Sequence, residues 1–379
     1  MTLVFDRIDS AVPQVHALVI GVGGYRYLPG GQEEVSPALL RLGQLLSPPL
    51  SAAAFSDWTE TELRHPGAEL GSIDLLVSYA PSSESTHRRD VGMPSTGAVK
   101  AAVRQWKQRC DTHPSNVALF FFCGHGLEYG SSYLLLEDYG ADIDEAPLEA
   151  ALDLTHLVKA MRGCQARDQY FLVDACRTTP RSWSLIDLPS GVQPLAFSPT
   201  AADRREEVGV LQAAAGGARA WAPAQGRGPT FFTAALLEAL RGQAAVYDDE
   251  SERWHVLFTR VVEAVSELCV ASQVPDARVQ GIKPWHLLTG PPRVSVVVRC
   301  RPENAAGQVN PSLKPHDPAA PEPDEWQLLQ SSWHTQATAG QHELEVPYRH
   351  GGSFMQPPSR SVEIRPPSRT LWADSGEAR

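Results

Sequence analysis

The sequence predicts an α/β protein built around a mostly parallel β-sheet, and three observations support this fold class. Residues 170–173 form an apolar run that passes directly into polar residues and Cys176. Residues 117–122 form a second run of the same design, which ends at His125. Such runs are typical of strands that are buried on both faces of a parallel sheet. Segments with helical spacing separate the runs, which favours right-handed β–α–β connections.

The composition indicates which binding partners and which cellular location to expect. The 379 residues include 44 Asp and Glu but only 33 Lys and Arg, and the net charge of −11 does not favour nucleic acid or anionic lipid. None of the six cysteines belongs to a C-x-x-C pair, so no metal site is predicted. The first residues lack the apolar core of a signal peptide, and no apolar run reaches the ~18 residues of a membrane span. We therefore expect a soluble cytoplasmic protein with reduced thiols and no membrane partner.

The first half of the chain alternates between apolar runs and helical patterns. Ser36 followed by Pro37 predicts the start of a leucine-rich helix, because proline is favoured at the first helical position. Residues 47–71 show no periodic pattern and are expected to form loops. Ser95 and Thr96 are candidate caps for a second helix. The predicted strands of this half are residues 15–22, 73–77 and 117–125, and the second helix is residues 97–108.

The second half repeats the alternation less regularly. Thr155 is expected to cap a helix that ends at Met161, before the strand that leads to Cys176. Residues 177–207 are polar and interrupted by prolines, and a loop of this length inside a compact domain is usually functional or cleavable. The remaining predicted strands are residues 133–136, 208–213 and 285–288, and the remaining helices are residues 230–240 and 253–270.

Gly290, followed by two prolines, marks a predicted domain boundary. Residues 1–290 are expected to form the α/β domain, with 177–207 as its interdomain linker loop, and residues 293–379 a small β-rich module. Residues 304–324 are rich in proline and alanine and are expected to be a mobile linker. The strand-like segments of the module are residues 294–298, 326–329, 342–346 and 361–364.

Cys176 and His125 carry the chemistry that the sequence predicts. Both follow buried strands, and the carboxyl ends of parallel strands meet at one edge of a sheet. A free thiol is only about a few per cent thiolate near pH 7, and a neighbouring imidazole can take its proton and later protonate a leaving amine. The main-chain N–H groups of Gly126 and Cys176 are the candidate oxyanion donors, because Gly126 has no side chain to block a carbonyl.

Each of these residues also has an ordinary structural explanation. A strand-end histidine or a buried cysteine taken alone is usually part of the packing, and only their joint placement favours catalysis. Asp174 could cap the strand end or pair with Arg177. Gly21-Val22-Gly23-Gly24 is similar to the start of a dinucleotide loop, but Arg26 stands where the third glycine belongs. Four acidic residues could bind calcium, although they lack EF-hand spacing and a solvated loop is the simpler explanation: Asp138, Asp142, Asp144 and Glu145.

Two motifs together resemble those of the caspase-like cysteine peptidases, a group that includes caspases, metacaspases and bacterial relatives: Cys123-Gly124-His125-Gly126 and Asp174-Ala175-Cys176-Arg177. In the caspase signature the histidine lies about 50 residues before the nucleophile, as it does here. The resemblance covers residues 15–288 and implies a caspase-like three-layer sandwich with a mostly parallel central sheet. It implies that His125 and Cys176 form the catalytic dyad and that Gly126 and Cys176 supply the oxyanion hole.

The residue two positions before the nucleophile departs from the caspase pattern. Caspases have glutamine there, whereas this chain has Asp174 and so resembles metacaspases and related enzymes. In those relatives the acidic residue lines the pocket for the residue before the scissile bond. The resemblance therefore implies an endopeptidase that cleaves proteins or peptides after Arg or Lys, with no cofactor other than the calcium that activates some metacaspase relatives.

The resemblance also bears on regulation. Many relatives are zymogens activated by cleavage of the interdomain linker, either by the enzyme itself or by an activating protease, and Arg204 and Arg205 are the first candidate positions here. Bacterial relatives act in regulatory or defence pathways, in which a regulatory partner is expected. Two alternatives stay open. One is a catalytically silent caspase-like scaffold that binds a partner, and the other is a related thiol acyl-transferase.

Overall fold

The computed structural model describes residues 2–36, 39, 42–83, 90–178, 190–197, 202–223, 228–269, 273–348 and 358–374. Its internal contacts divide the chain into two compact units. The first unit comprises Met1–Leu237 and Val265–Pro284, and the second comprises Glu238–Ala264 and Trp285–Arg379. The division of the chain near residue 290 stays a prediction.

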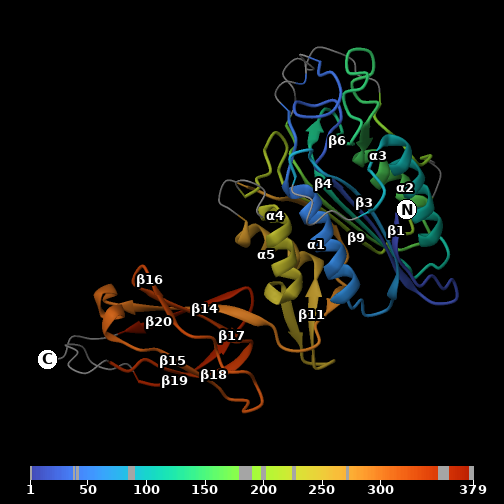
Figure 1. Cartoon of the computed structure of the whole chain (residues 1–379). Coiled ribbons are helices and arrows are strands. Elements are labelled where there is room, and N and C mark those ends of the chain that lie inside the picture. The colour runs from blue at the N-terminus through green and yellow to red at the C-terminus, as the bar shows by residue number, and fades with distance from the viewer. Residues whose placement is uncertain are drawn as a thin grey trace. The chain divides into compact units, whose positions relative to one another are not determined.

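A seven-stranded sheet forms the centre of the first unit (Figure 1). Its strands run in the order β1-β3-β2-β4-β8-β9-β12. The five inner strands are parallel, and the two edge strands are antiparallel to their neighbours. The bounds are β1 Leu3–Asp6, β2 Gln14–Val22, β3 Glu69–Ser78, β4 Val117–Gly124, β8 Asp168–Ala175, β9 Glu207–Gln212 and β12 Asp276–Gln280. Strands β2 and β4 are buried along their whole length, which explains their continuous apolar sequences.

Helices cover both faces of this sheet and complete a three-layer α/β fold. Helices α1 and α4 lie on one face, and α2 and α3 lie on the other (Figure 1). Their bounds are α1 Ser47–Thr61, α2 Thr96–Cys110, α3 Leu154–Ala160 and α4 Phe231–Glu238. The side chain of Ser95 caps α2, as predicted. Among the helices that the structure describes, none is both long and apolar enough to cross a membrane.

The helix predicted to start after Ser36 includes residues 37, 38, 40 and 41, which lie outside the described residues, and the described residues 42–46 are not helical. The helix α1 begins at Ser47, in a segment that was expected to be irregular. The reason is that the serine–proline signal occurs twice in this region, and the second copy starts the helix, with Pro48 and Pro49 in its first turn. Leu39 is instead buried in a short turn against the core.

A small antiparallel sheet follows the histidine motif. It contains β5 Gly126–Glu128, β6 Ser132–Leu135 and β7 Ala151–Asp153, and β6 matches the strand predicted at residues 133–136. The helix that was expected to have Thr155 as its cap is instead capped by the side chain of Asp153.

The predicted helix over residues 253–270 is only partly correct. The residues that were expected to form its first turn belong to the strand β11 Arg253–Leu257. The helix α5 spans only Phe258–Leu268. Strand β11 pairs in a separate small sheet with β10 Ala245–Asp248 and β13 Pro284–Leu287. The predicted strand at 285–288 therefore exists but does not join the central sheet.

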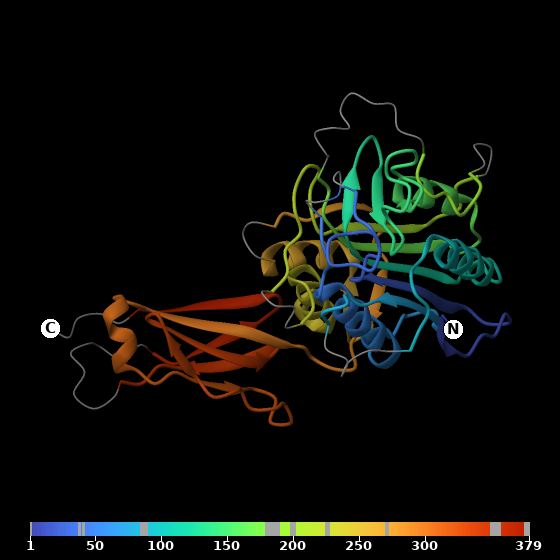
Figure 2. The ribbon, with the colours of Figure 1, turned by 45° about the horizontal axis from the view of Figure 1, so that its top comes forward.

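The C-terminal strands form a β-sandwich of two facing sheets (Figures 1 and 2). One sheet has the order β16-β17-β14-β20 and the other β15-β18-β19. The bounds are β14 Arg293–Arg301, β15 Ser312–Pro315, β16 Gln327–Leu329, β17 Ser332–Thr338, β18 Gly340–Glu345, β19 Arg360–Ile364 and β20 Ser368–Asp374. Residues 304–324 were expected to be a mobile linker, but they contain β15 and most of the short helix η7 Glu303–Gln308, whose Ala305 and Ala306 enter the core.

Candidate active site

His125 and Cys176 lie next to each other at the carboxyl edge of the central sheet. The register of the parallel pair β4–β8 places Gly124 opposite Ala175, and each of the two residues follows directly. Both side chains line one cavity of about 290 Å³. The structure therefore brings together the thiol and the imidazole that the sequence predicted.

Two residues from the segment between β2 and α1 hold His125 in place. Its Nε2 lies 2.8 Å from the main-chain oxygen of Gly43, and its own main-chain N–H donates to the hydroxyl of Tyr25 at 2.8 Å. The rings of Tyr25 and His125 also pack together, with their centroids 5.0 Å apart. Because a carbonyl can only accept, Nε2 must carry the proton in the neutral ring, and Nδ1 is free to accept one.

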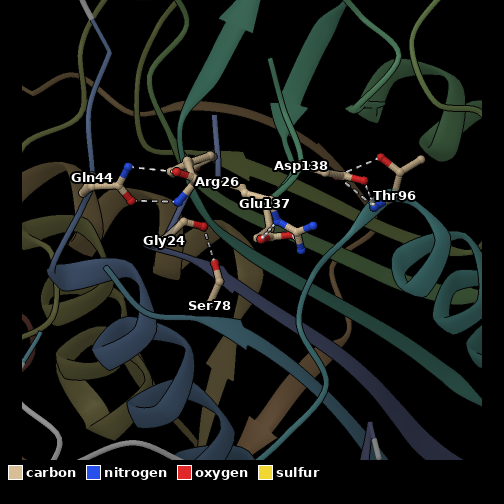
Figure 3. Close-up of polar contacts among 8 residues, drawn as sticks. Gly24, Arg26, Gln44, Ser78, Thr96, Glu137 and Asp138 are labelled. Atoms are coloured by element: carbon tan, nitrogen blue, oxygen red, sulfur yellow. Dashed lines mark hydrogen bonds and ion pairs between the residues drawn. The ribbon is translucent and has the colours of Figure 1, made fainter. Parts of the chain in front are cut away.

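A polar network fixes the loop that supplies Tyr25 (Figure 3). The side chain of Gln44 accepts from the N–H of Tyr25 at 2.8 Å and donates to its carbonyl at 2.9 Å. The hydroxyl of Ser78 donates to the carbonyl of Gly24 at 2.8 Å. Arg26 forms an ion pair of 3.1 Å with Glu137. The loop thus has little freedom to displace the ring that holds His125.

The thiol of Cys176 faces a different partner. Its Sγ accepts a hydrogen bond from the N–H of Ala220 at 3.3 Å. Within the part of the chain that the structure describes, no hydrogen bond joins Sγ to either ring nitrogen of His125. The two groups share a cavity but are not yet paired, a situation that is common in catalytic sites without substrate.

Burial shifts both groups toward their neutral forms. It lowers the pKa of His125, an effect that the hydrogen bond with Gly43 partly opposes. It raises the pKa of the Cys176 thiol, which the N–H of Ala220 partly offsets. The resting pair is therefore thiol and imidazole rather than thiolate and imidazolium, so proton transfer must accompany attack on a substrate.

The loops that carry the two residues touch through Gly126. A Cβ atom at this position would lie 2.5 Å from the carbonyl oxygen of Cys176 and 2.9 Å from Cβ of Ala175. Arg177 adds a second link, since its guanidinium bonds to Glu128 at 2.9 Å and to Asp276 at 2.5 Å. Only glycine permits this approach of the two segments, which places the N–H groups of Gly126 and Cys176 in one region.

Asp174 is a buried carboxyl group that lines the same cavity. Its Oδ2 accepts hydrogen bonds from the hydroxyls of Thr230 and Thr233, the latter at 2.6 Å. Its Oδ1 is buried and accepts no hydrogen bond from an N–H or O–H group of the described residues, although the thiol of Cys123 lies within hydrogen-bonding reach of the carboxyl group. Burial raises its pKa, and the two threonine hydroxyls oppose this. Asp174 does not pair with Arg177, whose guanidinium bonds to other carboxylates.

The two candidate cleavage positions lie just before β9. The side chain of Arg204 is exposed, whereas that of Arg205 folds back onto Asp203, with a hydrogen bond of 2.7 Å. The N–H of Glu206 donates to the carbonyl of Arg167 at 2.9 Å, so the chain is already tied to the sheet one residue later. Residues 179–189 and 198–201 of the predicted linker lie outside the described residues.

The first carboxylate of the acidic loop, that of Asp138, forms hydrogen bonds within the protein. Asp138 accepts hydrogen bonds from the N–H and the hydroxyl of Thr96, each at 3.0 Å, at the start of α2 (Figure 3). Over the described ranges, no three side chains of His, Cys, Asp or Glu lie close enough together to hold a metal ion.

Several residues of the site were not found from the sequence. Gly43 and Gln44 lie in the segment that was predicted to be a leucine-rich helix, and Gly43 and Ala220 contribute only main-chain groups, which leave no side-chain signature. Thr230 was expected only to open a helix, yet its hydroxyl also bonds to Asp174.

A thiol and an imidazole at adjacent strand ends of a mixed α/β sheet define a caspase-like protein. The family model described as the caspase domain matches residues 71–283, more than half of the chain. The chain therefore belongs to the caspase domain family of cysteine peptidases.

The individual proteins that match this chain have low sequence identity to it. An uncharacterized protein of Sinorhizobium fredii, y4kE, is 29% identical over 205 residues, which are 53% of this chain and 57% of the relative. The match thus spans little more than half the length of that protein. Protein GSU0716 of Geobacter sulfurreducens has a TM-score of 0.44 at 12% identity, over 71% of this chain and 94% of its own. Caspase-1 of Spodoptera frugiperda has a TM-score of 0.41 at 10% identity, over 73% of this chain and 91% of its own.

Proposed function

We propose that this chain is a cysteine endopeptidase that cleaves after Arg or Lys through His125 and Cys176. The observation that carries the specificity is the buried carboxyl group of Asp174, which lines the same cavity as His125 and Cys176. Burial disfavours the ionised form of this carboxyl group, and a substrate cation bound in the same cavity would stabilise its negative charge. Two opposite charges about 4 Å apart at an effective dielectric near 20 attract by roughly 4 kcal/mol before desolvation is subtracted.

The reaction follows from the positions of the polar groups. Sγ of Cys176 attacks the peptide carbonyl while Nδ1 of His125 takes the thiol proton, and Nε2 keeps its hydrogen bond to Gly43. The N–H groups of Gly126 and Cys176 stabilise the oxyanion. His125 then gives the proton to the leaving amine, and water hydrolyses the acyl-enzyme to restore the thiol.

A fluorogenic peptide panel tests this proposal. Substrates that differ only in Arg, Lys or Asp before the scissile bond are assayed with the wild-type chain, Cys176→Ala, Asp174→Asn and Cys300→Ala, with and without calcium. We expect Arg and Lys substrates to be cleaved at least about 100-fold faster than Asp substrates. Cys176→Ala should abolish turnover, and Asp174→Asn should remove most of the preference. Cys300→Ala, which deletes a thiol of the C-terminal sandwich, should retain activity.

Two other results would redirect the assignment. Turnover of Asp substrates alone would contradict the role of Asp174. A folded chain without turnover of any substrate would favour the scaffold, and ligated product on addition of an amine acceptor would favour the acyl-transferase.

Regulation is the second part of the proposal. We propose self-cleavage after Arg204 in preference to Arg205, because the side chain of Arg204 is exposed and that of Arg205 is paired. Mass spectrometry of fully active enzyme checks this, and an intact chain would count against it. A bacterial regulatory or defence role is part of this proposal through the resemblance to bacterial caspase-like peptidases, and the Sinorhizobium fredii relative fits a bacterial source.

A further inference from the structure

One face of the four-stranded sheet in the C-terminal sandwich is hollowed. A cavity of about 750 Å³ is lined by side chains from all four strands, β16, β17, β14 and β20. On β14, Val296, Val298 and Cys300 are buried in the sandwich core, so the alternate residues Val297 and Arg299 face outward into the cavity. We call this surface the Arg299 hollow.

A row of side chains crosses the floor of the hollow. The strand register places Leu329 opposite Ser332, Ser332 opposite Arg299, and Arg299 opposite Trp372. Arg301, the next outward residue on β14, holds its guanidinium 4.0 Å from the centre of the Trp372 ring. The guanidinium of Arg299 lies 5.9 Å from the same ring. The tryptophan thus orients the arginines while their N–H edges stay available.

Arg299 has no acidic partner among the side chains that the structure describes. Its cross-strand neighbours are a serine and a tryptophan, and no ion pair joins it to Glu303, which lines the same cavity. Acidic residues outnumber basic ones in the whole chain by 44 to 33, so pairing would be the expected state of an arginine. His334 lines the hollow as well.

The other wall of the hollow is apolar. Leu328 and Leu329 end β16 and are 43% and 52% exposed. The turn that follows holds Gln330 and Ser331 at φ of 44° and 65°, in the left-handed region that non-glycine residues seldom adopt. The hairpin thus presents two leucines whose apolar surface is about half exposed, and a partner that covers them would remove that surface from water.

We propose that the Arg299 hollow binds a short peptide segment of a partner protein that carries a carboxylate side chain next to an apolar one. The carboxylate pairs with Arg299, and the apolar side chain covers Leu328 and Leu329. The net charge of −11 and the presence of Glu303 disfavour long polyanions such as nucleic acid or anionic membranes. A sugar would require an open tryptophan face, but Arg301 covers a face of the Trp372 ring. The site is independent of the proposed peptidase activity.

Direct binding to the full-length chain tests the site. The chain carries Cys176→Ala so that no probe is cleaved. The probe is a fluorescent octapeptide of alternating leucine and glutamate, and its matched control replaces every glutamate with glutamine. We expect a Kd below about 100 μM for the glutamate peptide and at least about tenfold weaker binding of the glutamine peptide.

Three variants locate the site. Arg299→Gln should weaken binding by about tenfold or more, because a charge-assisted hydrogen bond is lost. Leu329→Thr should weaken it several-fold and is safe for folding because the side chain is half exposed. Lys314→Gln removes one positive charge from the opposite sheet, where Lys314 pairs with Glu345, and should leave the Kd within about twofold.

Specific outcomes would overturn the proposal. Equal affinity for the two peptides would remove the role of the carboxylate, and unchanged binding by both Arg299→Gln and Leu329→Thr would place the site elsewhere. Tighter binding of a heparin fragment or of phosphatidylserine vesicles than of the peptide would identify a polyanion or membrane site instead. Thermal unfolding of each variant is measured in parallel, and Leu329→Thr decides the question if Arg299→Gln does not fold.

Discussion

The Nε2 atom of His125 lies 2.8 Å from the main-chain oxygen of Gly43, a residue 82 positions earlier in the chain. This contact joins the histidine loop to the segment that leads into α1. It selects one tautomer of the ring, because the carbonyl oxygen requires a proton on Nε2. The nitrogen that must accept the thiol proton is thus left unprotonated before substrate arrives.

The tautomer and the protonation state of His125 can be measured directly. In a chain labelled with ¹⁵N-histidine, we expect His125 to show a protonated Nε2 and an unprotonated Nδ1. Its pKa should lie below the ordinary value of about 6.5, since burial disfavours the imidazolium. The His125→Gln chain assigns the signal by its loss. A protonated Nδ1, or titration above the ordinary pKa, would contradict the structure.

The contact between Gly126 and the nucleophile loop predicts a sharp effect of one methyl group. In Gly126→Ala, the new Cβ would overlap the carbonyl oxygen of Cys176 and force the two loops apart. We expect kcat/KM to fall by about 10²-fold or more, because the oxyanion donors are displaced. Gly97→Ala is the matched control, since a Cβ there meets nothing within 4 Å. Similar kinetics for the two variants would show that the approach of the loops is unimportant.

The buried thiol predicts an unusual pH profile of alkylation. The thiolate is the reactive form, and burial raises the pKa of Cys176 above its ordinary value. The rate of inactivation by iodoacetamide should therefore be low near pH 7 and should still increase at about pH 9, without a plateau below that point. The rate is followed by mass spectrometry of the peptide that contains Cys176. A plateau near neutral pH would indicate a resting thiolate–imidazolium pair instead.

The central sheet and the neighbouring positions of His125 and Cys176 were predictable because burial on both faces leaves a continuous apolar sequence. Strands β4 and β8 carry that signal, and they end one residue before His125 and Cys176. Strand β12 was missed because it lies at the edge of the sheet and is largely exposed, so it has no apolar run. Strand β17 was missed because a tryptophan, a threonine and an alanine fill its inward positions, which weakens the alternation.

The contacts around His125 and Cys176 were harder to predict from the sequence. Gly43 and Ala220 act through main-chain atoms, and Gln44 acts on the main chain of Tyr25. Such contacts depend on tertiary approach and not on residue type. Asp174 belongs to the motif around Cys176 and was therefore singled out. Its two threonine partners come from the start of α4, more than fifty residues later in the chain.

The imidazole of His16 predicts how stability depends on pH. The side chain is buried on β2, and its Nδ1 lies 2.9 Å from the hydroxyl of Ser72. Burial and then the charge of Arg109 lower its pKa from 6.5 to about 4. Because the folded pKa lies below the unfolded one, the unfolded chain binds more protons as the pH falls from 6.5. The free energy of unfolding should therefore decrease by up to about 3 kcal/mol between pH 7 and pH 4 from this residue alone.

Urea unfolding at several pH values isolates this contribution. Other groups also titrate in this range, so the wild-type chain is compared with His16→Asn, which cannot titrate at this position. We expect the wild-type chain to be the more stable of the two near pH 7, since asparagine cannot reproduce the packing of the ring. The difference should shrink steadily as the pH falls toward 4, because only the wild-type chain must then bury a group that prefers to be charged. A constant difference over this range would show that His16 is not held neutral in the folded state.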